Sequence, residues 1–257
     1  YECSALTSVE LSDELTSIGW SAFNGCSALS SIVIPLSVAS IGSNAFNECS
    51  SLTIYAEATS RPDGWVYEGN YSYDDNWNPD NRPVMWGQSY SGGLLYKKVD
   101  DGVEIVRCDY TGDVVIPSTI EGEPVVALSP TSASVFESPS QVTSVTLPAS
   151  LKRASEGVFY GCTELDSVTM PVVGGEVSRF VDLFRSYSVN VPQGLTVDVI
   201  GTSPIPDATS ASEGYFAGSG IEEVNIAGGV GAIGGYAFAG CTSLSTLTLK
   251  SGVTSIG

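Results

Sequence analysis

The chain has 257 residues, with 29 acidic and 10 basic side chains, a formal net charge of −19 and no histidine. This charge argues against binding to nucleic acid or to an anionic membrane surface, because both need clustered lysine and arginine. The lack of histidine removes Ser-His-Asp and Cys-His catalytic arrangements and most zinc sites. The hydrophobic content of 42% is enough for a substantial core, and no apolar run reaches the ~18 residues that span a bilayer.

A twelve-residue motif recurs along the chain. It reads IGWSAFNGCSAL at 18–29, IGSNAFNECSSL at 41–52 and IGGYAFAGCTSL at 233–244. Phe23 and Phe46 are 23 residues apart in this frame. A fixed period of about 20–50 residues is typical of solenoids, in which each repeat forms one coil.

Each period divides into three segments. The first, as at 29–35, ends in apolar–polar alternation and a proline, which predicts a short strand with one buried face. The second, as at 38–42, predicts a short extended run closed by a glycine turn. The third, as at 43–49, has small residues and predicts a single helical turn that inserts Phe46 into the coil. Because one coil cannot bury its apolar side chains alone, neighbouring coils must stack.

The pattern predicts six such strands, each with three side chains that point outward. The outward residues are Thr7, Ser8, Glu10, Ser30, Ser31, Val33, Thr143, Ser144, Thr146, Asp166, Ser167, Thr169, Glu222, Glu223, Asn225, Ser245, Thr246 and Thr248. Twelve of the eighteen are Ser or Thr, four are acidic, and none is aromatic or basic. Because protein-binding hot spots favour Trp, Tyr and Arg, we expect specific binding elsewhere first.

Aromatic residues concentrate between residues 61 and 96, which hold eight of the 24 in the chain. Aromatic faces stack on sugars and anchor protein interfaces. The alternative is that they form a small core for an insertion with few aliphatic residues. We favour the core interpretation for the three tryptophans of this segment, which are Trp65, Trp77 and Trp86.

The tyrosines of the same segment are the better candidates for binding. Tyr67, Tyr71 and Tyr73 alternate with polar residues, so exposure and burial are equally compatible with the sequence. We take these tyrosines, with the neighbouring Asp74 and Asp75, as candidate ligand-binding residues.

Metal binding is the weaker interpretation of the acidic stretch that follows. The alternating Asp and Asn residues of 74–80 resemble the oxygen ligands of a calcium loop. However, Pro79 stands where the turn glycine is needed, and Met85 where a bidentate glutamate belongs. We favour an ordinary polar loop and assign no metal ligand and no cofactor.

Five of the six cysteines share one repeat position: Cys3, Cys26, Cys49, Cys162 and Cys241. Adjacent coils lie ~4.8 Å apart, which is within reach of a disulfide. Three consecutive cysteines cannot all pair, however, and the other two have proline or serine at the preceding equivalent position. We expect buried free thiols, with disulfides as the alternative.

Catalysis by carboxylates is not expected. The acidic pairs at 100–101 and 222–223 are the available candidates for general acid–base work. With 29 acids in the chain, such pairs arise by coincidence, and nothing in the sequence places either pair in a cleft. We interpret them as solvated surface and expect no enzyme activity.

The combined pattern closely resembles the BspA-like branch of leucine-rich repeats, a family of bacterial surface and secreted proteins. It reads L-x-x-[IV]-x-[IL]-P…[VI]-x-x-I-G-x-x-A-F-x-x-C. The segments 61–87, 112–128 and 179–201 resemble an interruption, an opening variant unit and a recurring long unit of that family. The resemblance implies a leucine-rich-repeat solenoid of the α/β-horseshoe type, in which each coil of 22–23 residues adds a short parallel strand opposite a short helical turn.

We expect one continuous solenoid with three parts: repeats at 1–58, an aromatic insertion at 59–88, and a variant unit with further repeats at 89–257. Both ends cut through a repeat, so we expect a fragment of a longer protein. The resemblance implies a non-enzymatic adhesion or binding module, secreted or at the bacterial cell surface, that recognises host or neighbouring-cell proteins. The alternatives are a glycan-binding module that acts through the insertion and a structural spacer that projects another domain. We expect no nucleic-acid partner and no membrane insertion.

Overall fold

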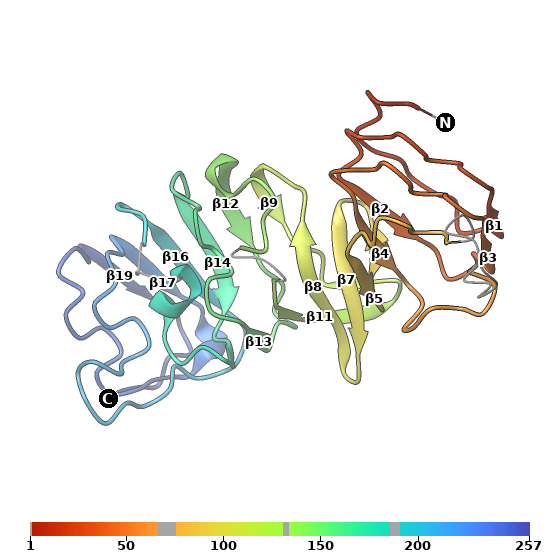
Figure 1. Ribbon diagram of the computed structural model, residues 1–257. Coiled ribbons are helices and arrows are strands. Elements are labelled where there is room, and N and C mark those ends of the chain that lie inside the picture. Colours follow the sequence, from red (N-terminus) through yellow and green to blue (C-terminus); the bar gives the residue numbers. More distant parts are fainter. Residues whose placement is uncertain (1, 66–75, 131–133, 186–190) are drawn as a thin grey trace. The chain divides into compact units, whose positions relative to one another are not determined.

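The computed structural model describes residues 2–65, 76–130, 134–185 and 191–257 (Figure 1). The chain divides into two compact units, Tyr1–Tyr90 and Ser91–Gly257. Their regular structure is almost entirely short β-strands. The described residues also contain three short 3-10 helices: η1 (Pro139–Gln141), η2 (Phe180–Phe184) and η3 (Gly228–Val230).

The first unit stacks its coils through two small parallel sheets. One sheet pairs β1 (Ser17–Ile18) with β3 (Ser40–Ile41), and the other has the order β2 (Ser31–Ile34), β4 (Thr53–Ala56), β5 (Val84–Trp86). The register places Ile18 beside Ile41 and Ile32 beside Ile54. Equivalent residues of successive repeats are therefore neighbours, as the period predicts. β6 (Ser89–Ser91) lies where this unit ends and the next begins.

The second unit carries a six-stranded parallel sheet. Its order is β19 (Thr246–Leu249), β17 (Glu223–Ile226), β16 (Thr196–Ile200), β14 (Ser167–Pro171), β12 (Val142–Thr146), β9 (Gly112–Val115). A second set of strands has the order β15 (Gly174–Gly175), β13 (Arg153–Ala154), β11 (Glu123–Leu128), β8 (Gly102–Cys108), β7 (Leu94–Val99). In this set β10 (Thr119–Ile120) pairs with β11, and separately β18 (Ala232–Ile233) pairs with β20 (Ser255–Ile256). All these pairs are parallel except β7–β8 and β10–β11.

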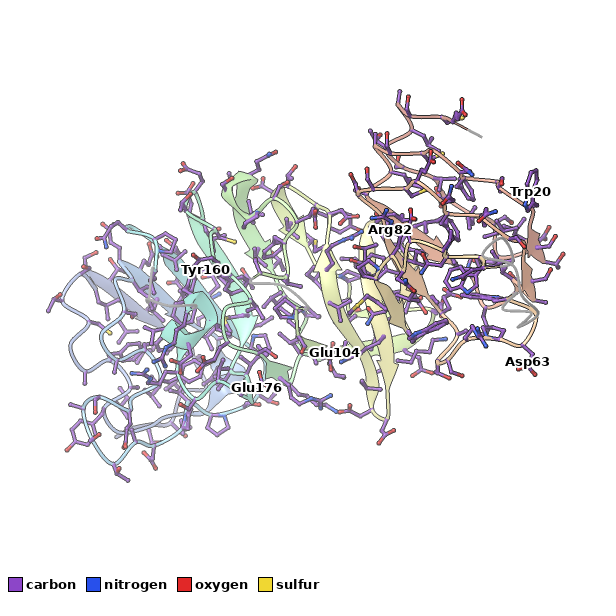
Figure 2. All side chains as sticks on the ribbon, viewed as in Figure 1. Trp20, Asp63, Arg82, Glu104, Tyr160 and Glu176 are labelled. Atoms are coloured by element: carbon purple, nitrogen blue, oxygen red, sulfur yellow. The ribbon has the colours of Figure 1, made fainter. Side chains whose placement is uncertain are left out.

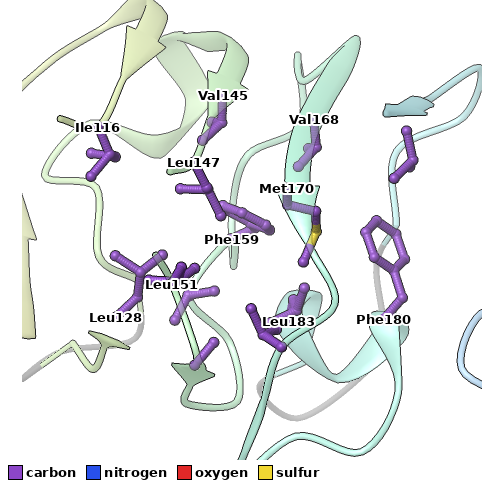
Figure 3. Packing of buried hydrophobic residues seen from close by; sticks show 14 of the residues in the cluster. Ile116, Leu128, Val145, Leu147, Leu151, Phe159, Val168, Met170, Phe180 and Leu183 are labelled. Carbon is purple, nitrogen blue, oxygen red and sulfur yellow. The ribbon is translucent and has the colours of Figure 1, made fainter. Parts of the chain in front are cut away.

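The core of the second unit lies between these sheets and the turns of each coil. Alternate residues of the strands point inward, and Figure 3 shows Val145 of β12 and Leu147, which follows that strand, beside Val168 and Met170 of β14. Phe159 enters the same cluster from a turn segment and is 1% exposed. The apolar positions of the repeat are therefore the buried ones, as the sequence predicts.

The third segment of each repeat differs from the expected helical turn. In the first unit it is a run of hydrogen-bonded turns, in which Asn24 N donates to Ser21 O at 3.2 Å and Cys26 N donates to Phe23 O at 3.1 Å. Ser21 and the equivalent Asn44 have φ angles of 53° and 56°. Because this left-handed conformation interrupts a right-handed helix, a helical turn does not form.

The first predicted strand is also absent. Residues 6–11 follow the strand pattern but form no strand, and Leu6, Val9 and Leu11 are only half-buried. A strand this short is stabilised mainly by burial of its apolar side chains. Because these three side chains are only partly buried, that stabilisation is small and no paired strand forms.

Candidate functional site

The solvent-facing side of the six-stranded sheet carries two rows of polar side chains. Val168, Val197 and Val224 of neighbouring strands are fully buried, and the residues on either side of them face outward. One row contains Ser144, Ser167, Thr196, Glu223 and Thr246, and the other contains Thr146, Thr169, Asp198, Asn225 and Thr248. None of the eighteen outward residues named from the sequence is buried. In β2, β12, β14 and β17 they alternate with buried apolar residues, which confirms the predicted orientation in these strands.

Hydrogen bonds within the face hold several of these side chains in place. Asp113 Oδ1 accepts from Thr143 Oγ1 at 3.0 Å and from Ser144 Oγ at 2.9 Å. Asn225 Nδ2 donates to Asp198 Oδ1 at 3.0 Å and to Glu223 Oε1 at 3.1 Å. The contacts of Asp113 and Asp198 cross from strand to strand, whereas that of Glu223 lies within β17. Together they hold three carboxylates on the face.

Sequence reasoning missed part of this face. β16 places Thr196 and Asp198 in the centre of the sheet, and β9 adds Asp113 at its edge. The signal for β16 is present, because apolar residues alternate with polar ones at 195–199. It lies in the unusual long unit at 179–201, outside the 22–23-residue frame.

The three tryptophans of the predicted insertion form a core, as expected. Trp65 and Trp77 are 1% and 5% exposed, and their ring centroids are 5.1 Å apart. Trp86 packs against Trp65 at 5.5 Å, and Phe46 packs edge-on against Trp77 at 5.9 Å. The indole Nε1 of Trp65 donates to Val38 O at 2.9 Å. Trp65 and Trp77 therefore serve packing, and the half-buried Trp86 packs against the same cluster.

The five candidate binding residues lie outside the described residues. Tyr67, Tyr71, Tyr73, Asp74 and Asp75 all belong to the segment 66–75, so their role stays a prediction. The residues on both sides of that segment are firmly held. Before it, Ile41 N donates to Gly64 O at 3.2 Å, and after it, Asn44 N donates to Asn76 O at 2.8 Å.

The described part of the 74–80 stretch uses its oxygen atoms within the protein. Asn78 is 7% exposed, and its side-chain amide donates to Arg82 O at 3.0 Å and accepts from Arg82 N at 2.9 Å. Asp80 accepts from the Arg82 guanidinium at 2.9 Å and from Glu48 N at 2.8 Å. This arrangement is that of a polar loop tied to the neighbouring coil, which is the interpretation favoured from the sequence.

The six cysteines are free thiols. Cys26, Cys49, Cys108 and Cys162 are buried, Cys241 is half-buried and Cys3 is exposed. Burial raises the pKa of Cys108 to about 11 and that of Cys162 to about 12. Such thiols are inert at neutral pH, since the thiolate is the reactive form.

Asp101, one of the acidic pair at 100–101, belongs to an ion-pair cluster. Asp101 contacts the Arg153 guanidinium at 2.9 Å and Lys152 Nζ at 3.0 Å. Hydrogen bonds from these two groups, chiefly that of Arg153, hold the pKa of Asp101 well below its usual range. The described ranges contain no group of three or more His, Cys, Asp or Glu side chains that could hold a metal ion. Within the same ranges, no helix is both long and apolar enough to span a bilayer.

Comparison with known proteins adds a family match. The family described as BspA type Leucine rich repeat region matches in six copies, at residues 1–61, 128–195 and 208–257. A leucine rich cell surface protein from Faecalibacterium prausnitzii A2-165 is 23% identical over 96% of this chain and 55% of its own, with a TM-score of 0.34. A leucine-rich repeat protein from Bacteroides ovatus ATCC 8483 is 20% identical over 95% of this chain and 78% of its own, with a TM-score of 0.34. The chain thus spans about half the length of the first of these. No curated protein matches it.

Proposed function

Because the chain belongs to the BspA-type leucine-rich-repeat family, we propose that it is a non-enzymatic binding module, secreted or displayed on a bacterial cell surface. Its ligand is an extracellular protein of a host or neighbouring cell. The family match supports a repeat module for protein interaction. The surface location and the adhesive role rest on the family resemblance.

We place recognition in the segment 66–75, which contains Tyr67, Tyr71 and Tyr73. The observation that carries this choice is the pair of buried tryptophans at its borders, Trp65 and Trp77, whose rings are in contact at 5.1 Å. Binding residues are often carried by segments that connect the elements of a rigid scaffold. Tyrosine also supplies a large contact area at a low cost in conformational entropy.

The polar sheet face is the competing surface. Its rows of Ser, Thr, Asp and Asn offer many hydrogen-bonding groups but no aromatic or arginine anchor among the outward residues of β12, β14, β16, β17 and β19. Interfaces that bind tightly concentrate their energy in such anchors. We therefore assign the sheet face a supporting role and the segment 66–75 the leading one.

The test is a binding screen of the purified chain against immobilised extracellular-matrix proteins and glycans. A variant with Tyr67, Tyr71 and Tyr73 changed to Ala keeps Trp65 and Trp77, so the aromatic core is preserved. The matched control is Tyr236→Ala, which removes a tyrosine that is 53% exposed in another part of the chain. Loss of binding by the triple variant alone supports the assignment.

The other outcomes separate the competing functions. Binding to glycans but not to proteins, lost in the triple variant, identifies a sugar-binding module. Equal binding by all three proteins moves recognition to another surface, and a Thr169→Arg, Thr196→Arg double variant then tests the sheet face. No binding by folded wild-type protein supports the spacer function and contradicts the proposal.

A further inference from the structure

Cys26 and Cys49 are stacked neighbours in the first unit. Ile18 pairs with Ile41, and the rings of Phe23 and Phe46 are parallel with centroids 5.6 Å apart. Both relations have the 23-residue offset that also separates Cys26 from Cys49. The two thiols are 1% and 0% exposed, so both lie inside the stack of coils.

The thiol of Cys49 points toward the coil that contains Cys26. Its Sγ donates to Phe23 O at 3.0 Å. The backbone N–H of Cys26 donates to the same oxygen at 3.1 Å. Cys49 Sγ and the Cys26 backbone therefore meet at one carbonyl group.

An equivalent column in the second unit gives the spacing between the side chains. Cys241 Sγ donates to Phe216 O at 3.0 Å, which matches the contact of Cys49 with Phe23. Ser219 occupies the position of Cys26 in this column, and its Oγ is 3.6 Å from Cys241 Sγ. Side chains at this position of successive coils are thus in van der Waals contact.

We propose that Cys26 and Cys49 are a disulfide-forming pair that links two adjacent coils. Each thiol loses its hydrogen and one S–S bond forms between the two sulfurs. The oxidant is a small-molecule disulfide such as oxidised glutathione, whose own S–S bond breaks and which takes up the two electrons and two protons as two thiols. The inference is independent of the binding function.

The general spacing of stacked coils is compatible with a disulfide. Paired strands of adjacent coils lie ~4.8 Å apart, which is within the roughly 4.4–6.8 Å between Cα atoms that disulfides span.

Cys162 and Cys241 have no cysteine at the equivalent position of the preceding coil. Pro139 stands at the position equivalent to Cys162 in the preceding coil, and Ser219 lies beside Cys241, with Oγ 3.6 Å from Sγ. Cys3 belongs to the same column as Cys26 and competes for it. We assign the bond to Cys49 because its Sγ already points toward the coil of Cys26.

The experiment is oxidative refolding followed by thiol counting. Both thiols are buried, and burial raises the pKa of Cys49, so oxidation is tested during refolding in a mixture of oxidised and reduced glutathione. Free thiols are then alkylated under denaturing conditions and counted by mass spectrometry, and the bridge is mapped on proteolytic fragments. The expected count falls by two from six, with the bridge between Cys26 and Cys49.

Two variants provide matched controls. A Cys3→Ser, Cys49→Ser double variant should keep all of its remaining thiols, and serine is accepted at this repeat position, as Ser219 demonstrates. Ser219→Cys recreates the column beside Cys241 and should gain a second bridge. Six free thiols in wild-type protein with native circular dichroism, or a mapped bridge between Cys3 and Cys26, would overturn the proposal. A Ser219→Cys variant without the second bridge would contradict the spacing on which it rests.

Discussion

The rings of Phe23 and Phe46 stack face to face, with centroids 5.6 Å apart and planes inclined by 1°. Phe216 and Phe238 repeat this relation in the second unit, at 5.3 Å and 2°. Each pair joins the same position of two successive coils. Aromatic stacking, and not strand pairing alone, therefore holds the repeats in register.

The phenylalanine stack continues where the repeat frame is interrupted. The 3-10 helix η2 contributes Phe180 and Phe184, whose centroids are 5.4 Å apart. Phe184 packs on Phe159 at 5.3 Å, and Phe180 packs on Phe216 at 5.4 Å. The irregular unit at 179–201 lacks the regular motif, but its two phenylalanines occupy the part of the core that the motif phenylalanine fills in other coils.

Removal of a stacked ring should destabilise the first unit strongly. Phe46 is fully buried and contacts both Phe23 and Trp77. We expect Phe46→Ala to lower the free energy of unfolding by about 3–5 kcal/mol, measured by urea denaturation. Trp20→Ala is the control, because Trp20 projects from the surface of the same unit and is 73% exposed (Figure 2). Its cost should stay within about 0.5 kcal/mol, and equal losses in both variants would contradict the assigned core.

The register of β16 makes a second prediction. Val197 is fully buried, whereas the adjacent Thr196 faces solvent in a row of polar side chains. Val197→Asp places an unpaired charge in the core, and we expect it to cost several kcal/mol or to prevent folding. Thr196→Asp should change the thermal midpoint little. The reverse order would show that the strand is shifted by one residue.

Most of the fold could be predicted from the sequence because the same apolar pattern recurs in several repeats. Most apolar residues of the motif are buried, from Ile18 and Phe46 to Val224 and Ile233, whereas Leu247 and Leu249 are exposed. β16 was missed because its alternation occurs only once, outside the regular spacing. The helical turn was wrong because the left-handed conformations of Ser21 and Asn44 depend on tertiary contacts that residue type alone does not reveal. Residue type also does not reveal that the side-chain amide of Asn78 forms hydrogen bonds with the backbone of Arg82.

The hydrogen bond of Trp65 leads to a third prediction. Its Nε1 donates to the carbonyl oxygen of Val38 at 2.9 Å, and the side chain is 1% exposed. Trp65→Phe keeps an aromatic ring but leaves that buried carbonyl without this donor, which costs about 1–3 kcal/mol. Urea denaturation of this variant beside Trp86→Phe, a half-buried tryptophan of the same cluster, measures the difference. A smaller loss for Trp65→Phe than for Trp86→Phe would show that the hydrogen bond is unimportant.

The ion pairs of Asp101 predict a dependence of stability on pH. Hydrogen bonds from Arg153 and Lys152 lower the pKa of Asp101 from an ordinary value of 3.8. Since the pKa is lower in the folded state, the carboxylate stabilises the fold above pH 3.8, and this contribution is lost as the pH falls further. We expect Asp101→Asn to lower the thermal midpoint near neutral pH, by a difference that shrinks as the pH falls below 3.8 and disappears only below the lowered pKa of Asp101. A difference that persists in strong acid would exclude the charge as its cause.

The candidate binding residues were chosen from the composition of their segment, and their role has not been tested. Tyr67, Tyr71 and Tyr73 stood out because aromatic residues concentrate around them. Trp65 and Trp77 contact each other in a packed core, which accounts for the tryptophans of this aromatic-rich segment. The tyrosines lie outside the described residues, so their role in binding stays a proposal.

The measurement that tests the central claim most directly is the affinity of the Tyr67→Ala, Tyr71→Ala, Tyr73→Ala variant for the ligand that the screen identifies. Surface plasmon resonance compares it with wild type and with Tyr236→Ala, and circular dichroism confirms that all three are folded. We expect the triple variant to bind at least tenfold more weakly, since one lost hot-spot aromatic alone costs about 2 kcal/mol, while Tyr236→Ala binds like wild type. Unchanged affinity of the folded triple variant would contradict recognition through this segment.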